Sequence, residues 1–317
     1  MNDILSFLTS PVVSGFFSAS MRLAAPILLA ALGGIYNERA GVLNIGMEGM
    51  MLMGSLIGFT IGHITGSLWL GVLAAALTGV LLGLILGFFT ITLDANQVVA
   101  GISINLLCVG LASFLYRLFY GLGLQPRGTD YGIWNIPGLS QIPVIGPMFF
   151  QQSPLVYLTY LIIAVSFIVI FRSSWGLSII ATGENPAAAE TLGVNVVRTR
   201  YISMVISGAL CGIGGAFLSL VATSVFLDNM TAGRGYIALA ILLLGRRNPL
   251  GLLAAALMFG AADALQLRTQ LLNIGIPFQF MLMLPYLLTI VVLSFFVRRT
   301  DNPAALGEHF KQGGGES

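Results

Sequence analysis

Long apolar runs separated by short polar segments make up most of the chain. An α-helix needs about 20 apolar residues to cross the hydrocarbon core of a bilayer. Nine runs approach this length, with boundaries near residues 11–35, 42–62, 67–91, 97–120, 153–171, 201–222, 233–245, 249–267 and 278–297. The pattern predicts an all-α, polytopic bundle of about nine transmembrane spans, within a range of about 8–10.

The seventh run, residues 233–245, is too short to cross a bilayer by itself. It is flanked by Gly233, Gly235 and Gly245. Interrupted helices are tolerated at membrane depth where they are enclosed by protein or line a cavity. We therefore expect a broken or tilted helix here, lining a cavity in the bundle.

Composition supports a membrane protein and excludes several other classes. Hydrophobic residues make up 57% of the chain, charged residues only 8%, and the mean hydropathy is +0.94. A soluble domain carries about 25% charged residues, so this chain cannot cover an aqueous surface. The net charge of +2 includes no basic stripe, so nucleic acid is not an expected partner. Cys108 and Cys211 lie within apolar runs and are expected to be small buried residues.

Basic residues favour one orientation in the membrane, because cytoplasmic loops are enriched in Lys and Arg. With the C-terminus inside and the N-terminus outside, nine basic residues are cytoplasmic and four are external. The cytoplasmic set is Arg39, Arg172, Arg198, Arg200, Arg246, Arg247, Arg298, Arg299 and Lys311. The external set is Arg117, Arg127, Arg234 and Arg268.

This orientation also predicts the organisation of the chain. Residues 1–300 form a single transmembrane domain, with a cytoplasmic loop at 173–200 and a Gly- and Pro-rich external segment at 121–153. The tail 301–317 is polar and ends in three glycines, Glu and Ser. We expect this tail to be cytoplasmic and disordered.

Glycines recur every four residues in several runs. The series are Gly54-Gly58-Gly62-Gly66, Gly79-Gly83-Gly87 and Gly208-Gly212-Ala216. At this spacing small residues share one helix face and let neighbouring backbones approach closely. Static helix packing is the favoured interpretation, and a sliding or gating surface is the alternative.

The sequence contains no catalytic or nucleotide-binding motif. A P-loop requires Gly-x-x-x-x-Gly-Lys-Ser/Thr, and Lys311 is the only lysine. A Gly-x-Ser-x-Gly elbow, a His-Glu-x-x-His helix and a Cys/His cluster are also missing. We therefore expect a chain that is not an enzyme and that binds no metal or cofactor of its own.

Ionisable and amide residues inside the runs are candidates for a substrate path. Ionisable side chains at membrane depth face a bundle interior or a water-filled passage. Amides offer donors and acceptors to a neutral solute. The candidates are Asn44, Glu48, Asn96, Asn105 and Asp263. For each, an interhelical hydrogen bond or ion pair is the alternative, and Glu48 or Asp263 would carry the proton in an ion-coupled transporter.

The loop 173–200 contains the pattern of a short capped helix. Asn185 suits the N-cap, Pro186 the first turn and Gly193 the end. Because the segment lacks a large apolar face, docking into a groove on another protein is favoured over an ordinary interfacial helix. The residues assigned to this contact are Gly183, Glu184, Asn185, Pro186, Ala188, Ala189, Glu190, Leu192 and Gly193.

At this loop the sequence resembles the permease subunits of ABC importers in the branched-chain amino acid, sugar and nucleoside family. The shared pattern is Gly-x-Asn-x-x-Ala-Ala-x-x-x-Gly, found here from Gly183 to Gly193. Two further blocks, Asn37–Gly49 and Asp94–Gly101, are similar to the nucleoside branch. The resemblance covers about residues 10–300, although many relatives carry an additional N-terminal span.

The resemblance implies a permease subunit of an ATP-driven importer in the bacterial cytoplasmic (inner) membrane, with nucleosides as the substrate class. It implies that residues 183–193 form the coupling helix, which docks on a cytoplasmic ATP-binding subunit that holds ATP and Mg²⁺. The other implied partners are a second homologous permease subunit, an extracytoplasmic solute-binding protein or lipoprotein, and membrane lipid. A permease for simple sugars or other small solutes, an ion-coupled secondary transporter and a non-transporting scaffold are the alternatives.

Overall fold

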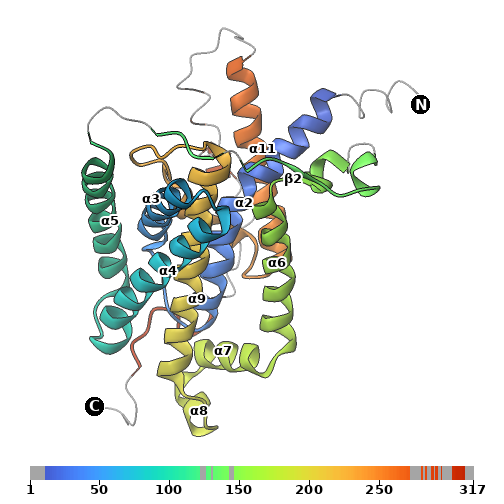
Figure 1. Cartoon of the computed structure of the whole chain (residues 1–317). Coiled ribbons are helices and arrows are strands. Elements are labelled where there is room, and N and C mark those ends of the chain that lie inside the picture. Colours follow the sequence, from blue (N-terminus) through green and yellow to red (C-terminus); the bar gives the residue numbers. More distant parts are fainter. Residues whose placement is uncertain are drawn as a thin grey trace.

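The structure, a computed structural model, describes residues 11–121, 126–129, 131–142, 146–271 and 302–310, with isolated positions between 280 and 294. Helices lying side by side account for most of it (Figure 1). Within the described residues, seven helices are long and apolar enough to cross a membrane. They are α2 (Pro11–Arg39), α3 (Met47–Thr65), α4 (Leu68–Gly87, continued by η1, Phe88–Thr92), α5 (Gln97–Tyr120), α6 (Pro154–Arg172), α9 (Val196–Phe217, continued by η4, Leu218–Ala222) and α11 (Pro249–Leu271).

Shorter elements lie within the bundle and at its two ends. The short apolar helix α10 (Arg234–Leu244) packs against α2, α3 and α11. One end, here called the α8 end, carries α7 (Ser174–Glu184) and α8 (Pro186–Thr191) (Figure 1). The opposite end, here called the hairpin end, carries the antiparallel strands β1 (Trp134–Asn135) and β2 (Gln151–Gln152) with the turns η2 (Leu139–Gln141) and η3 (Gly146–Phe150).

The predicted all-α polytopic architecture is confirmed, with two boundaries that differ. The second run was expected to be helical from residue 42, but residues 42–46 are not helical and α3 begins at Met47. The sixth of these helices, α9, begins at Val196, before its apolar run, because Asn195 caps its first turn. The seventh run forms the short helix α10, and its expected place beside a cavity stays a prediction. Most of the ninth run, 278–297, lies outside the described residues, so the number of spans stays a prediction.

Side-chain caps explain where several helices start. The Oδ1 of Asn96 accepts hydrogen bonds from the amides of Val98 and Val99, at 3.0 and 3.1 Å. The Oδ1 of Asn195 accepts one from the amide of Arg198 at 2.9 Å. The first amides of a helix have no partner inside it, so these bonds fix the boundary.

Helix α9 lies at the centre of the bundle and packs against α2, α3 and α4. Glycine makes these contacts close. A Cβ atom on Gly54 would lie 2.6 Å from the Cα of Gly212, and one on Gly79 would overlap the carbonyl oxygen of Gly208. Membrane helices associate through such close van der Waals packing. Members of all three predicted glycine series therefore lie at helix contacts.

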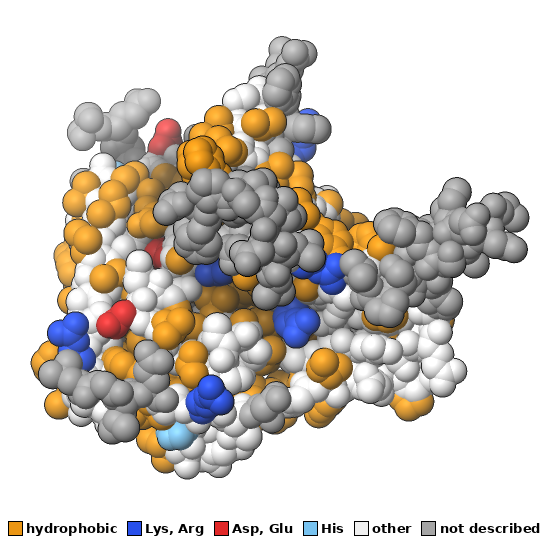
Figure 2. All heavy atoms as spheres, turned by 90° about the horizontal axis from the view of Figure 1, so that it is seen from above, with side chains coloured by type: hydrophobic (Ala, Val, Ile, Leu, Met, Phe, Trp, Pro, Cys, Tyr) orange, Lys and Arg blue, Asp and Glu red, His pale blue; other side chains and the backbone are white. Residues whose placement is uncertain are grey.

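Large apolar side chains cover the outward faces of α4, α5 and α6. Leu77, Leu106 and Leu161 are each at least 60% exposed. Figure 2 views the hairpin end and shows hydrophobic side chains along the edge of the molecule. Soluble monomers rarely expose apolar patches of this extent, whereas lipid solvates them. The chain therefore has the exterior of a multi-pass membrane protein.

The polar tail is packed against the bundle over part of its length. In residues 302–310, the amide of Ala305 donates to the carbonyl of Gly183 at 2.9 Å, and that of Gly307 donates to the carbonyl of Gly41 at 3.0 Å. Ala305 is only 3% exposed. Backbone hydrogen bonds, which composition does not reveal, hold this segment. The expectation of disorder is wrong for these residues, and residues 311–317 lie outside the described part of the chain.

Candidate functional site

Helix α8 projects from one end of the bundle (Figure 1). The Oδ1 of Asn185 accepts a hydrogen bond from the amide of Ala188 at 3.0 Å, and Pro186 occupies the first turn. Gly193 has a φ of +86°, a conformation that L side chains rarely adopt. Leu192 is 83% exposed, whereas Ala189 is buried. The predicted cap and stop are present, and they leave an apolar side chain available to a partner.

The base of α8 is fixed by α7. A Cβ atom on Gly183, in the last turn of α7, would overlap the carbonyl oxygen of Arg39 at the end of α2. The ring of Trp175 stacks on that of Tyr36 with centroids 6.0 Å apart. These contacts mean that α8 cannot shift without α7 and the end of α2. The exposed residues Glu184 and Ala188 lie on the free side of this unit.

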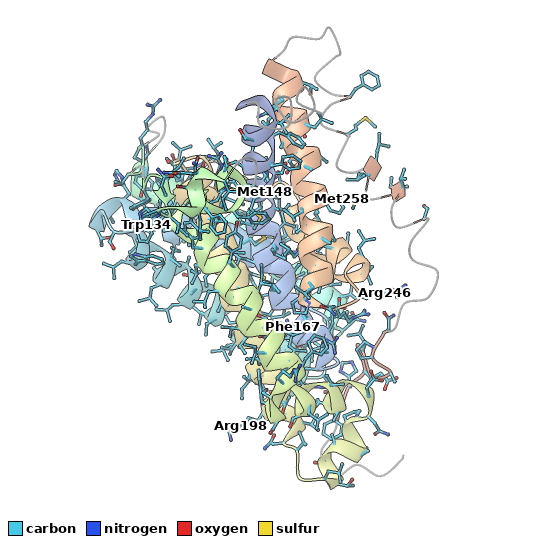
Figure 3. The ribbon with its side chains drawn as sticks, turned by 90° about the vertical axis from the view of Figure 1, so that its right-hand side faces the viewer. Trp134, Met148, Phe167, Arg198, Arg246 and Met258 are labelled. Atoms are coloured by element: carbon cyan, nitrogen blue, oxygen red, sulfur yellow. The ribbon has the colours of Figure 1, made fainter. Side chains whose placement is uncertain are left out.

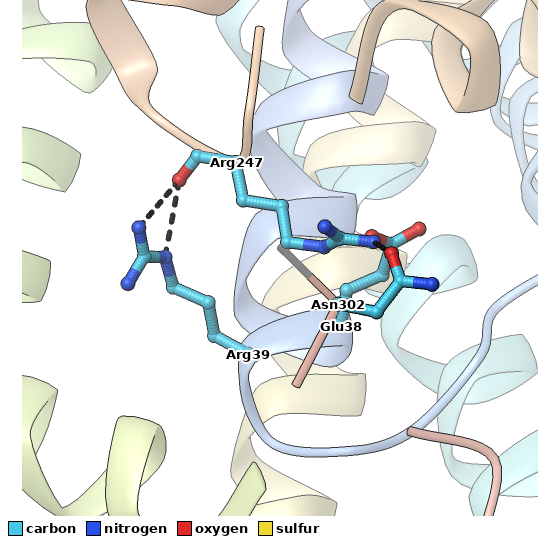
Figure 4. A network of polar contacts seen from close by, with 4 residues as sticks. All are labelled: Glu38, Arg39, Arg247 and Asn302. Atoms are coloured by element: carbon cyan, nitrogen blue, oxygen red, sulfur yellow. Dashed lines mark hydrogen bonds and ion pairs between the residues drawn. The ribbon is translucent and has the colours of Figure 1, made fainter. Parts of the chain in front are cut away.

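A buried ion pair lies at the same end of the bundle (Figure 4). The Nε of Arg247 donates to the Oε2 of Glu38 at 2.5 Å, and the two side chains are 5% and 6% exposed. Arg39 donates from Nε and Nη2 to the carbonyl of Arg247, at 3.0 and 2.9 Å. The Nη2 of Arg247 donates to the Oδ1 of Asn302 at 2.8 Å. The network joins α2, the connection between α10 and α11, and the tail.

Two helices begin inside the bundle instead of at one of its ends. Near the α8 end, the amide of Leu43 donates to the side chain of Gln97 at the start of α5. The next contact, between the amide of Gly49 and Asn105, is eight residues further along α5, or about 12 Å. The first turn of α3 therefore lies near the middle of a hydrocarbon core of about 30 Å. Helix α10 begins beside it, at Arg234.

Glu48 caps α10 across this junction. Its Oε1 accepts a hydrogen bond from the amide of Gly233 at 2.8 Å, and its Oε2 accepts one from Gly235 at 2.6 Å. The side chain is buried, with Glu48 5% exposed. A carboxylate is stabilised at a helix N-terminus by the partial positive charge there. A Cβ atom on Gly235 would lie 2.5 Å from the amide nitrogen of Glu48, so glycine is required at this position.

Asn105 connects the same junction to α5. Its Oδ1 accepts from the amide of Gly49 at 2.8 Å, while its Nδ2 donates to the carbonyl of Ile45 and to the hydroxyl of Tyr236, both at 2.9 Å. Asn105 therefore holds the non-helical entry to α3 and the first turn of α10 together. Tyr236 is absent from the predicted path residues, because a tyrosine in an apolar run gives no distinct signal.

The remaining path candidates divide between the junction and the periphery. Asp263 on α11 faces Arg234, the first residue of α10, with Oδ2 and Nη2 3.9 Å apart. The Nδ2 of Asn44, beside the entry to α3, donates to the hydroxyl of Ser207 at 3.0 Å. Asn96 lies away from the junction, where it caps α5. Glu48, Asn105 and Asp263 thus all contact the start of α10, and a role in contacting the permeant stays a prediction.

A cavity of about 480 Å³ opens at the hairpin end. Its lining is rich in hydroxyl, amide and guanidinium groups and includes Arg22, Tyr131, Gln151, Gln152, Ser153 and Ser224. The Oγ of Ser153 is buried and has no hydrogen-bond partner among the described residues. Burial raises the pKa of the Tyr131 phenol, so its hydroxyl remains protonated at neutral pH. Such a lining suits a neutral solute rich in donors and acceptors. Sequence reasoning placed segment 121–153 outside but gave no sign of this cavity.

These features define a class of protein before any relative is considered. An apolar exterior, broken helices that meet inside the bundle and an exposed capped helix at one end are the parts of a membrane permease. Among the described residues, no group of three or more His, Cys, Asp and Glu side chains is placed to hold a metal ion. The profile of the family described as "Branched-chain amino acid transport system / permease component" matches residues 16–293. The chain belongs to this family.

Three similar proteins match nearly the whole chain. Guanosine ABC transporter permease protein NupQ of Bacillus subtilis is 40% identical, over 95% of this chain and 98% of NupQ. The protein named "Putative glucose ABC transporter permease protein TsgC13" of Haloferax volcanii is 37% identical, over 94% of this chain and 98% of its own length. Nucleoside ABC transporter permease protein NupC of Lactococcus lactis is 36% identical, over 90% and 93%. No solved structure matches the chain. The predicted resemblance to ABC permeases is confirmed.

Proposed function

We propose that this chain is one of two permease subunits of an ATP-driven importer for nucleosides. The observation that carries the proposal is its 40% identity to a guanosine permease over 95% of the chain. The geometry of α8 supports it, since a short capped helix with an exposed Leu192 offers a docking surface to a partner.

The distribution of basic side chains supports placing the α8 end in the cytoplasm. Figure 3 shows Arg198 and Arg246 closer to α8, whereas Trp134 and Met148 lie at the hairpin end. Arg39, Arg198 and Arg247 belong to the elements of the α8 end. Lys and Arg are enriched on the cytoplasmic side of membrane proteins. The cavity at the hairpin end then faces an extracytoplasmic solute-binding protein or lipoprotein.

In this mechanism ATP is bound and hydrolysed on the cytoplasmic ATP-binding subunit. Helix α8 docks in a groove of that subunit, and the second permease subunit supplies an equivalent helix. Closure of the ATPase pair draws the two helices together. Because Gly183 lies directly on the backbone of Arg39, α2 moves with α8. The permeation path between the subunits opens outward only if the ATP-bound partner binds the outward-open state more tightly.

Simple sugars are the second candidate substrates, because the protein named "Putative glucose ABC transporter permease protein TsgC13" is nearly as similar to this chain. Nucleosides and sugars are both neutral and rich in hydroxyl groups. A nucleoside also carries a base that stacks on aromatic rings, and Tyr131 provides such a ring in the cavity lining. The nucleoside assignment is therefore preferred.

Uptake by the assembled transporter tests the substrate. The permease pair, its ATPase and its binding protein are reconstituted in liposomes, with ATP inside and radiolabelled guanosine or glucose outside. ATP-dependent uptake of guanosine, competed by other nucleosides and not by glucose, is the expected result. Uptake of glucose alone would favour the sugar assignment. Uptake that follows a pH gradient without any ATPase would show an ion-coupled secondary transporter.

Ala188→Glu is expected to detach the ATPase. Ala188 is exposed on α8, and a carboxylate there would be desolvated in an apolar docking groove at a cost of several kcal/mol. Co-purification of the ATPase with a tagged permease measures the effect, and Gly193→Leu provides a second variant. Ser174→Glu, which adds the same charge at the start of α7, is the matched control. Retention of the ATPase and of transport in both α8 variants would remove the docking assignment.

A further inference from the structure

The tail crosses the α8 end and contacts several elements that are far apart in the sequence. We call residues 302–309 the C-terminal strap. Its amide at Ala305 donates to the carbonyl of Gly183 at 2.9 Å, and its amide at Gly307 donates to the carbonyl of Gly41 at 3.0 Å. The carbonyl of Gly183 is in the last turn of α7, where carbonyls lack partners within the helix. The strap therefore completes the base of α8.

The fit between the strap and the turn after α2 is close. Gly41 has a φ of +82°, and a Cβ atom there would lie 3.0 Å from the carbonyl oxygen of Ala305. Further along the strap, the Nη1 of Arg200 donates to the carbonyl of Glu308 at 3.0 Å. The Nδ1 of His309 lies 3.6 Å from the Oδ1 of Asp94. These contacts tie the strap to α2, α9 and the segment before α5.

Asn302, the first residue of the strap, contacts the segment that connects α10 to α11 (Figure 4). The Oδ1 of Asn302 accepts a hydrogen bond from the Nη2 of Arg247 at 2.8 Å. Arg246 and Arg247 adopt φ values of +49° and +52°, in the left-handed region. Backbone of this kind persists only where its surroundings fix it, and here the surroundings are Glu38, Arg39 and the strap.

One short peptide thus joins the base of the coupling helix to the cytoplasmic end of α10. The opposite end of α10 is the N-terminus that Glu48 caps in the middle of the bundle. Helix α10 is only 11 residues long, so a displacement of its C-terminal connection moves the whole helix. The connection is one of packed groups and hydrogen bonds, the physical form that coupling between distant sites takes.

We propose that the C-terminal strap transmits movement of α8 to α10, so that its residues are positioning elements of the transport cycle. This inference rests on the proposed function of the chain as an importer subunit. The strap keeps its hydrogen bonds to Gly183 and Gly41 while α8 moves. Through Asn302, the strap then moves Arg247 as well. Loss of the strap leaves α8 able to dock on the ATPase but separates ATP hydrolysis from the opening of the bundle.

Truncation separates this role from a purely structural one. A chain that ends after Asp301 lacks the strap, and a chain that ends after Phe310 keeps it and is the matched control. In the assembled transporter, the shorter chain is expected to retain the ATPase subunit and most of the ATPase rate. Guanosine uptake per ATP hydrolysed is expected to fall about ten-fold or more, within the usual range of coupling between sites. The control is expected to behave as the full chain.

A point variant probes the contact with α10 in a full-length chain. Asn302→Ala removes the acceptor for Arg247 and is expected to lower uptake per ATP, whereas Asn302→Asp keeps an acceptor and is expected to restore it. Unchanged uptake per ATP in the shorter chain would overturn the proposal. So would a loss of uptake that only follows loss of the ATPase subunit, because the strap would then merely support the fold.

A readout without any permeant keeps this test independent of the substrate. Ser224→Cys places a thiol in the lining of the cavity at the hairpin end, while the native Cys108 and Cys211 are buried. The rate of its reaction with an impermeant maleimide is expected to change when ATP is trapped on the ATPase, and to stop changing once the strap is removed. A response that survives removal of the strap would contradict the proposal. If the full chain imports no nucleoside but shows this response, the proposed substrate fails and the strap's role stands.

Discussion

Glu38→Gln is expected to lower the free energy of unfolding by about 3–5 kcal/mol, because it leaves the guanidinium of Arg247 buried without its carboxylate. The side chain of Arg247 is 5% exposed, so water cannot replace the lost charge. The effect also spreads along the chain. The same guanidinium binds Asn302, and the backbone carbonyl of Arg247 binds Arg39. The variant is therefore expected to loosen the strap as well as the pair.

Thermal unfolding of the detergent-solubilised chain measures this prediction. Glu184→Gln removes one carboxylate from an exposed position at the same end of the bundle, and is expected to leave the midpoint nearly unchanged. The double variant Glu38→Met with Arg247→Met is expected to recover much of the loss, since a buried pair replaced by apolar groups of similar volume is often tolerated. Equal midpoints for Glu38→Gln and Glu184→Gln would show that the pair contributes nothing.

The architecture could be predicted because a segment that crosses a lipid bilayer must be apolar over most of its length. Apolar runs long enough to cross a bilayer leave a pattern that survives without knowledge of any contact. The capped helix α8 could be predicted equally well, because Asn185 and Gly193 act on neighbouring backbone groups. Asn96 could have been predicted as a cap from the same rules, because it immediately precedes an apolar run. The assignment to a substrate path overlooked this local role.

Contacts between distant segments could not be predicted in the same way. The acceptor of the Gly235 amide is Glu48, which lies 187 residues earlier in the chain. The strap is held through the carbonyls of Gly183 and Gly41, and a carbonyl is common to every residue. A polar, glycine-rich tail has the composition of a disordered segment. The position of the strap depends on the shape of the α8 end of the bundle, which forms only in the folded chain.

The environment of Glu48 also bears on the choice between importer and ion-coupled transporter. A proton-coupling carboxylate must exchange its proton with water during the cycle. Both oxygens of Glu48 instead accept hydrogen bonds from backbone amides at 2.8 and 2.6 Å. Asp263 faces Arg234 across 3.9 Å. The two candidate proton carriers therefore hold the start of α10 in place, which argues against the ion-coupled alternative.

Glu48→Leu is expected to destabilise the chain by about 3–6 kcal/mol and to abolish transport, because each buried amide left without a partner costs about 1–3 kcal/mol and a charge-assisted bond is lost. The variant removes the acceptor for Gly233 and Gly235 at a depth where water is scarce. It also removes the negative charge that stabilises the N-terminus of α10. Helix α10 is then expected to detach from α3.

The measurement compares unfolding midpoints and ATP-dependent uptake for Glu48→Leu, Glu48→Gln and Asp228→Asn. Gln keeps one carbonyl acceptor but presents an NH₂ group to the second amide, so an intermediate loss is expected. Asp228 accepts a hydrogen bond from Ser113 at an exposed position, and its variant controls for the loss of one carboxylate. A Glu48→Leu chain as stable and active as Asp228→Asn would show that α10 does not depend on this cap. The start of α10 would then be held by the contacts of Tyr236 with Asn105 and of Arg234 with Asp263.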